Sequence, residues 1–307
     1  MRKEFKNLLI WILGLVALII LSFRLYQSFS KSELTESFKL IFSIENFKYL
    51  FLCVLLMLVN WGIESFKWFK ISSVVEKISF LNAINSVLVG LAYGHLLPAR
   101  SSEFLGKILF YSEKNRNSIS VLHFVNAAFQ MYVTVVIGIF MLLLKFNFYN
   151  ADINLKIIIA FAVIIFLAIS ALIIYADKLH FLQKIIPFSS YEISHLLKLE
   201  LLVLSFIRYF VFLIQFYLIF LIFNTQQSFN LIFVSDIAIY FLVTSVIPMI
   251  SIIEVAVRSL VAIFVFKDIG ISDLEASLIA TLLWLINLVI PSIAGFAIVL
   301  IKFKLKK

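Results

Sequence analysis

The stretch LLVLSFIRYFVFLIQFYLIFLIF, residues 201–223, carries a single charged side chain, Arg208. A helix needs about 20 apolar residues to cross a hydrocarbon core of about 30 Å, so this stretch is long enough to span a membrane. The whole chain has the same character, since 63% of its 307 residues are hydrophobic and 14% are charged. Soluble domains are typically about 45–50% apolar and about 25% charged, and so short a chain has too little interior to bury the difference. The sequence therefore predicts a polytopic membrane protein.

The net charge of +9 does not indicate nucleic-acid binding. Basic residues gather at the two ends, in MRKEFK (1–6) and KFKLKK (302–307), as expected for cytoplasmic flanks that face anionic lipid. The single cysteine, Cys53, excludes an internal disulfide and a Cys-based metal site. The four histidines show no zinc-like spacing, and we find no nucleophile elbow and no glycine-rich phosphate loop. We expect no cofactor and no metal.

Several further runs are long enough to cross the membrane. Good candidates lie at 7–27, 48–68, 118–144, 156–176, 197–223, 231–247 and 276–301, and shorter or interrupted runs lie at 79–97 and 252–267. The first run fits either a retained helix, which we favour, or a cleaved signal peptide. The connections 28–47 and 177–196 predict interfacial helices. We expect one all-α transmembrane domain over 1–307 with about six to eight membrane helices.

The Lys and Arg residues near the runs predict the orientation of the chain. Both termini are expected in the cytoplasm, and the protein in the inner (cytoplasmic) membrane. Basic residues on both sides of 79–97 suggest that 79–113 enters the membrane and returns, with Pro98 at the turn. A second hairpin, broken at Pro248, would then enter from outside. The prediction is an inverted repeat with halves at about 48–150 and 197–301; the basic loop 24–48, placed outside, does not fit it.

Each expected hairpin carries charges just after its proline. Arg100, Glu103 and Lys107 follow Pro98, and Glu254 and Arg258 follow Pro248. If each proline opens a helix, each set shares one face. The N-terminus of such a helix and an arginine fork could together hold a phosphate. Charges at membrane depth are costly and suggest function. The alternative is a pair of ordinary interfacial loops whose charges reach water.

Other polar residues have simpler interpretations. Arg208 should face the bundle interior and pair with Glu254 or Glu103, unless the span begins only at Arg208 and leaves it interfacial. Glu64 and Lys67, beside two tryptophans, are interpreted as an interface anchor with an internal ion pair. Residues expected to make contacts between helices or bends are Asn126, Gln130, Asn287, Pro291 and Gly295. The candidate substrate-binding residues are therefore Arg100, Glu103, Lys107, Arg208, Glu254 and Arg258, and the candidate structural residues are Pro98, Pro248, Pro291 and Gly295.

The chain resembles the lysylphosphatidylglycerol synthase transmembrane family, the flippase-like membrane region. The resemblance rests on NWGIESFKWFK (60–70), LLPARSSEF (96–104), RYFVFLIQF (208–216), SVIPMISIIEVAVR (245–258) and LLWLINLVIPSIAG (282–295). Pro98, Arg100 and Glu103 match the family pattern of a proline, an arginine and a Gly-Glu pair, with Ser102 in place of the glycine. In the second half, Ile252 and Ile253 stand where the family often has small residues. The resemblance implies a lipid translocase or a related lipid-handling protein. It also leads us to expect the membrane region without the soluble aminoacyl-transferring domain of some relatives.

Three functions remain open from the sequence. The first is a flippase-like translocase that handles a phosphate-bearing membrane phospholipid or lipid-linked substrate at a midplane site between the halves. The second is a polytopic enzyme such as a lipid-linked sugar transferase, which would need acidic residues to hold a divalent cation. Its only candidates, Asp236, Asp268 and Asp273, form no DxD-like pair. The third is a membrane assembly partner. We expect no nucleic-acid partner.

Overall fold

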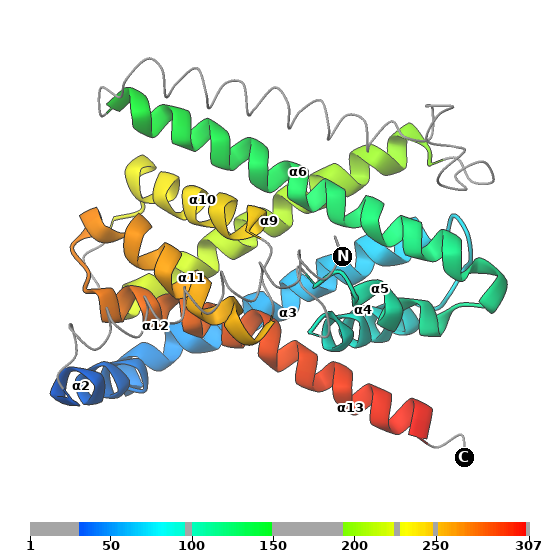
Figure 1. Ribbon diagram of the computed structural model, residues 1–307, viewed down its shortest axis with the longest axis horizontal. Helices are drawn as coiled ribbons and strands as arrows, with labels where there is room; N and C mark the ends of the chain where they lie inside the picture. The colour runs from blue at the N-terminus through cyan, green and yellow to red at the C-terminus, as the bar shows by residue number, and fades with distance from the viewer. Residues whose placement is uncertain (1–30, 96–99, 149–192, 224–227, 248–250, 305–307) are drawn as a thin grey trace, which may run out of the picture.

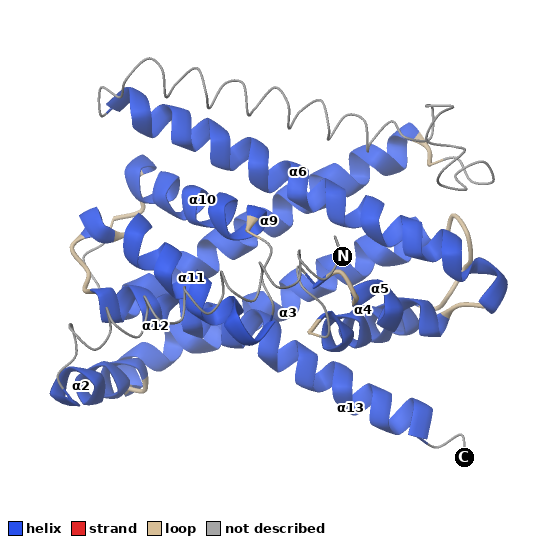
Figure 2. Cartoon of the chain, in the orientation of Figure 1, coloured by secondary structure: helices blue, strands red, loops and turns tan. Residues whose placement is uncertain are grey.

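The computed structural model describes residues 31–95, 100–148, 193–223, 228–247 and 251–304. Every regular element in these ranges is a helix, and they contain no strand (Figure 2). The predicted all-α fold is thus confirmed. The runs 7–27 and 156–176, together with Pro98 and Pro248, lie outside the described residues, as does most of the connection 177–196.

Four helical segments in the described part are long and apolar enough to cross a membrane. They are α3 (Ile44–Ser72), α6 (Arg116–Phe148), α9 (His195–Phe223) and the segment from α12 (Asp273–Trp284) through the π-helical turn η7 (Leu285–Val289) into α13 (Ile290–Lys304). Shorter apolar helices are α4 (Phe80–Gly94), α10 (Leu231–Val246) and α11 (Ser251–Val265). Each predicted run in the described ranges is therefore helical. The helix expected in 28–47 is α2 (Lys31–Ile41).

Polar side chains mark where these apolar helices begin. Ser43, Ser79 and Asn230 each accept a hydrogen bond from a backbone N–H of the first turn of α3, α4 and α10. Ser272 and Glu275 form a capping box at the start of α12. Such caps satisfy donors that have no partner within the helix. Local hydrogen bonding thus fixes the helix starts next to the loops.

Three pairs of helices that lie far apart in the sequence make the main contacts of the fold (Figure 1). The long helices α3 and α9 pack against each other, α6 packs along α10, and α13 packs along α4. Two hairpins complete the fold: α4 packs against the short helix α5 (Glu103–Lys107), and α10 packs against α11. In Figure 1 the two hairpins lie on opposite sides of the α3–α9 pair. The charged segments that follow the hairpin breaks therefore approach the same central pair of helices.

Glycines allow α4 and α5 to approach closely. A Cβ on Gly106 would lie 2.5 Å from the carbonyl oxygen of Val89, and one on Gly90 would lie 3.0 Å from the carbonyl oxygen of Glu103. The hydroxyl of Ser102 donates to the carbonyl of Tyr93 across the same contact, at 2.6 Å. This close crossing fixes the short helix that carries Glu103 and Lys107.

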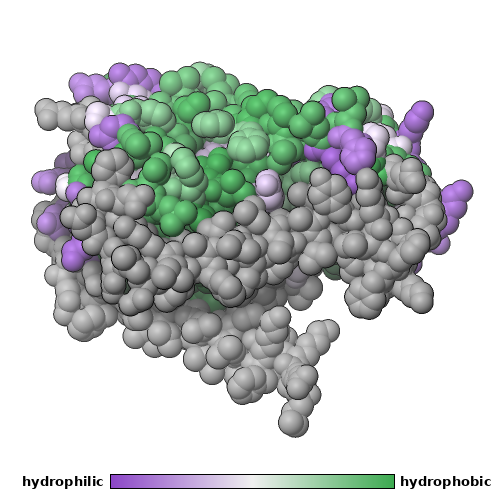
Figure 3. All heavy atoms as spheres, turned by 90° about the horizontal axis from the view of Figure 1, so that it is seen from above, coloured by the Kyte–Doolittle hydropathy of each residue, from purple (hydrophilic) through white to green (hydrophobic). Residues whose placement is uncertain are grey.

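The surface of the molecule fits a lipid environment. Large apolar side chains such as Phe51, Leu58, Phe210 and Phe296 are exposed on the long helices. Figure 3 shows a hydrophobic band whose two ends are hydrophilic. In water such a band would favour aggregation, whereas in a bilayer it faces acyl chains.

Outside the spans, Glu76 ties the loop after α3 to the start of α6. Its carboxylate accepts hydrogen bonds from the backbone and hydroxyl of Ser112 and from the amide of Asn115, at 2.7–3.3 Å. Burial acts to raise the pKa of Glu76, but these hydrogen bonds outweigh it and lower the pKa below its usual range. The loop thus has a fixed position beside the first hairpin.

The α4–α5 crossing gives a direct test of the packing. Gly106→Ala should destabilise the protein by about 1–3 kcal/mol, because its Cβ would press on the rigid backbone of Val89. Gly62→Ala, a matched change in α3 with nothing within 4 Å of the added atom, should stabilise it by about 0.5–1 kcal/mol. Thermal unfolding in mild detergent measures both. Equal stability of the two variants would contradict the packing.

Candidate functional site

A cavity of about 400 Å³ lies where the two hairpins meet the central helices. Helices α3, α5, α6, α9, α10 and α11 all contribute to its lining. Five of the six predicted substrate-binding residues line it: Arg100, Glu103, Arg208, Glu254 and Arg258. The sixth, Lys107, does not line the cavity; its ammonium lies 3.8 Å from the lining residue Glu64, and its side chain is only 2% exposed. Residues far apart in the sequence are therefore brought to one site.

In the first hairpin, Arg100 and Glu103 form an ion pair. Nη2 of Arg100 lies 2.6 Å from Oε1 of Glu103. Arg100 has a φ of 54°, in the left-handed region, and helix α5 begins only at Glu103. Pro98, where the predicted helix would open, lies outside the described residues. Within them Arg100 precedes α5, so the predicted common helix face with Glu103 and Lys107 is wrong for Arg100. A left-handed backbone at a non-glycine residue is costly and concentrates at binding sites.

In the second hairpin, the arginine and the glutamate lie one turn apart on a single helix. Arg258 donates from Nε and Nη2 to Oε1 of Glu254, at 3.0 and 2.8 Å. Glu254 is buried, while the Arg258 side chain keeps 23% exposure. The predicted common face of Glu254 and Arg258 is thus present in α11.

The third pair joins α9 to α3. Nη1 of Arg208 donates to Oε2 of Glu64 at 2.7 Å, and Nε donates to Oδ1 of Asn60 at 2.6 Å. The guanidinium also stacks on the ring of Trp61, 4.9 Å from its centroid. Arg208 is buried near the middle of α9, so the interfacial alternative is wrong. The expected partners Glu254 and Glu103 are also wrong, because the bonded carboxylate is Glu64.

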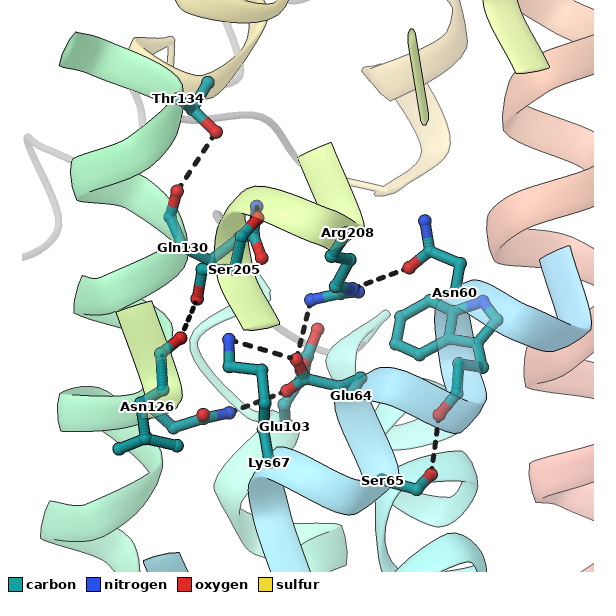
Figure 4. Close-up of polar contacts among 12 residues, drawn as sticks. Asn60, Glu64, Ser65, Lys67, Glu103, Asn126, Gln130, Thr134, Ser205 and Arg208 are labelled. Atoms are coloured by element: carbon teal, nitrogen blue, oxygen red, sulfur yellow. Dashed lines mark hydrogen bonds and ion pairs between the residues drawn. The ribbon is translucent and has the colours of Figure 1, made fainter. Parts of the chain in front are cut away.

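Glu64 has several partners at this cavity, and Figure 4 shows its contacts with Arg208, Lys67 and Asn126. Besides Arg208, it accepts a hydrogen bond from Nδ2 of Asn126 at 2.7 Å. The ammonium groups of Lys67 and Lys107 lie 3.7 and 3.8 Å from its oxygens. Lys107 also sits over the ring of Trp68, 4.4 Å from the centroid. The predicted Glu64–Lys67 ion pair is confirmed, but the interface-anchor interpretation is wrong because both side chains are buried.

The surrounding amides and the last helix hold these groups in position. Gln130 Nε2 donates to the carbonyl of Ser205 at 3.4 Å, so Asn126 and Gln130 make the predicted contacts between helices. Trp61 Nε1 donates at 3.0 Å to the carbonyl of Asn287, inside the π-helical turn. Pro291 follows that turn in α13, and Gly295 lies against the carbonyl of Leu88 in α4.

A second cavity of about 200 Å³ adjoins the first and shares several lining residues with it, including all three arginines. It is lined largely by apolar and aromatic side chains: Phe212, Tyr240, Phe241, Leu283, Trp284 and Leu288. The described residues contain no group of three or more His, Cys, Asp or Glu side chains that could hold a metal ion. The arrangement offers arginine donors for an anion next to apolar space.

Glu64, Asn60 and Trp61 were missed as site residues. A signal was present, because Asn60, Glu64 and Lys67 recur at three- and four-residue spacing and share one face of an apolar helix. A lipid-facing stripe would not carry three polar side chains, so that face must point into the protein.

A family of known proteins matches most of the chain. The family described as the lysylphosphatidylglycerol synthase TM region matches residues 11–295. No curated protein matches the chain.

Glu64 should be essential for stability. Glu64→Gln removes the counter-charge of three buried cations, so it should lower the free energy of unfolding by about 3–5 kcal/mol. The control is Glu200→Gln, which removes a partly exposed pair with Lys70 at 3.1 Å and should cost about 0–1 kcal/mol. Thermal unfolding in detergent compares them. A Glu64→Gln variant as stable as Glu200→Gln would refute the central role of Glu64.

Proposed function

Because the chain belongs to the lysylphosphatidylglycerol synthase transmembrane family, a membrane family with a lipid-related function, we propose that it is a lipid translocase. It would bind a phosphate-bearing lipid or lipid-linked headgroup in the cavity between its two halves and carry it across the bilayer. The second cavity, with its aromatic and apolar lining, would accept the part of the lipid next to the headgroup. A soluble anion would gain nothing from that lining, so the pair of cavities favours a lipid.

One observation carries the proposal: three Arg–Glu pairs from separate elements line a single cavity. An arginine fork fits a phosphate bidentately, and a glutamate holds the empty fork in place until a phosphate arrives. Exchanging a carboxylate for a phosphate keeps each guanidinium paired throughout. In an apolar environment this avoids the large cost of an unpaired buried charge.

The packing supports two halves of opposite membrane orientation. If α3–α6 and α9–α13 are related by a pseudo-twofold axis, α4 is equivalent to α10, and α6 to the α12–α13 segment. The contact of α6 with α10 is then equivalent to the contact of α13 with α4, and both are present. The helices α3 and α9, which would be equivalent, also pack against each other, as equivalent helices beside such an axis would. Inverted repeats with a binding site at their interface are common among transporters.

The enzyme alternative has less support. Of its candidate acidic residues, Asp236 pairs with Lys145. Asp268 and Asp273 lie in and just after the turn η6 (Lys267–Ile269), and neither lines the cavity that holds the arginines. No observation in the described part favours a transferase or an assembly role over translocation.

The inverted repeat predicts that the turns after the two hairpins face opposite sides of the membrane. Lys114 and Lys267 are exposed lysines in equivalent turns, η3 (Glu113–Asn115) and η6. After the buried Cys53 is replaced, Lys114→Cys should be protected from an impermeant thiol reagent in intact cells, and Lys267→Cys should be labelled. Labelling of both from the same side would rule out the inverted arrangement.

Arg100 provides the test of the binding role. Arg100→Ala should abolish flipping of a fluorescent phospholipid in proteoliposomes while the protein stays monodisperse, and Arg100→Lys should restore it only partly because lysine lacks the planar fork. The control is Arg116→Ala, which removes a surface arginine paired with Glu113 at 3.4 Å and should flip normally.

If Arg100 only neutralises Glu103, the single variant should misassemble, and Arg100→Ala combined with Glu103→Gln should restore both assembly and flipping. Normal flipping by Arg100→Ala, or by the double variant, would show that Arg100 does not bind the headgroup.

A further inference from the structure

The charges around the cavity do not balance, and the excess of positive charge lies around Glu64. Resting on the proposed function, we propose that the translocated headgroup carries a net negative charge, and that the buried lysines Lys67 and Lys107 select for it. The proposal narrows the substrate from any phosphate-bearing lipid to an anionic one.

The pairs in the two hairpins are neutral. Arg100 is matched by Glu103, and Arg258 is matched by Glu254. Each pair consists of one cation and one carboxylate within a single hairpin. Neither of these two pairs therefore adds a formal charge to the cavity.

Around Glu64, three cations share one carboxylate. Arg208, Lys67 and Lys107 all lie within 3.8 Å of its oxygens, and both lysines are at most 2% exposed. The only other group bonded to Glu64 in the described part is the neutral amide of Asn126. His123 also lines the cavity, and its ring packs against Trp68 and Phe124. One carboxylate against three cations leaves a formal excess of two positive charges.

Hydrogen-bond accounting points the same way. In the described residues, the charged side chains with a buried atom that lacks a hydrogen-bond partner are Lys67 (Nζ), Arg100 (Nε) and Arg116 (Nε). All three atoms are donors of cations, and none is a carboxylate oxygen. Two of these residues, Lys67 and Arg100, belong to the cluster around the cavity. Neutral side chains at the cavity also have acceptors without a partner, Oδ1 of Asn126 and Oε1 of Gln130, so the comparison concerns charge alone. The charged atoms without a partner at the site belong to cations, and the site therefore lacks negative charge.

The two lysines act from behind Glu64. They pair with the carboxylate from the side away from the cavity, since Glu64 lines it and neither lysine does. A carboxylate already neutralised by two lysines competes less for Arg208, whose guanidinium faces the cavity. An anionic headgroup can therefore bind Arg208 and reduce the buried excess charge at the same time. A zwitterionic headgroup brings its own cation and leaves that excess in place.

The probes are phosphatidylglycerol and phosphatidylcholine, which share a phosphodiester and differ in net headgroup charge. Binding to the purified full chain in neutral detergent is measured by native mass spectrometry, and flipping is measured in proteoliposomes with fluorescent analogues of both lipids. We expect phosphatidylglycerol to bind about tenfold more tightly than phosphatidylcholine and to be flipped faster.

Lys67→Met and Lys107→Met should each remove most of this preference. The matched control is Lys70→Met on the same helix, whose half-exposed ammonium pairs with Glu200; it should keep the full preference. Lys67→Met is less prone to misfolding than Lys107→Met, because Nζ of Lys67 makes no hydrogen bond. In that variant Glu64 keeps its other partners, Arg208, Lys107 and Asn126. Monodispersity is checked for every variant, and the comparison of the two lipids on the unmodified chain needs no variant.

The outcomes separate the two levels of the proposal. If both lipids bind and flip equally, the charge selectivity is refuted while the translocase function stands. A preference for phosphatidylglycerol that survives in Lys67→Met as it does in Lys70→Met refutes the role of the lysines. If the unmodified chain binds and flips neither lipid, the selectivity is refuted, and so is the translocase function for both of these phospholipids.

Discussion

The arrangement of the site depends on one buried contact, the ion pair between Glu64 of α3 and Arg208 of α9. Hydrocarbon offers a charged group no solvation, so a charge inside a membrane protein needs a partner from the protein. This pair joins α3 and α9, which have the most extensive contact of any two helices in the described part, and it fixes which faces of the two helices meet. Asn60, Trp61 and Asn126 are arranged around it and hold both ions in place. The hairpins then bring the remaining charges to a centre that this pair has already defined.

Close packing is the second requirement, and small residues meet it. Helices in lipid gain no hydrophobic free energy from each other, so they associate through contact and hydrogen bonds. Gly90 and Gly106 let α5 rest on the backbone of α4, and Gly295 does the same where α13 crosses α4. Without Gly90 and Gly106, α5, which carries Glu103 and Lys107, could not lie so close to the backbone of α4. The polar site is therefore supported by residues that have almost no side chain.

Hydropathy predicted the helices well, because a helix is the only open-chain structure that satisfies its own backbone in lipid. It also drew attention to Arg100, Arg208 and Arg258, since arginine is rare in such runs. It did not identify the partner of Arg208, because Glu64 lies 144 residues away and periodicity reveals a face but not what that face meets. The left-handed backbone of Arg100 was missed for a different reason, because its conformation depends on the packing of α5 against α4 and not on any local motif.

The π-helical turn at Leu285–Val289 has a consequence for the whole last helix. A π turn holds one residue more than an α turn, and each residue of an α-helix turns the chain by about 100°. The extra residue therefore sets the rotational phase of α13 relative to α12. With that phase Gly295 faces Leu88 of α4, while the carbonyl of Asn287 is turned toward the indole of Trp61. The extra residue thus lets one continuous helical segment contact Trp61 of α3 at the level of the π turn and α4 further along.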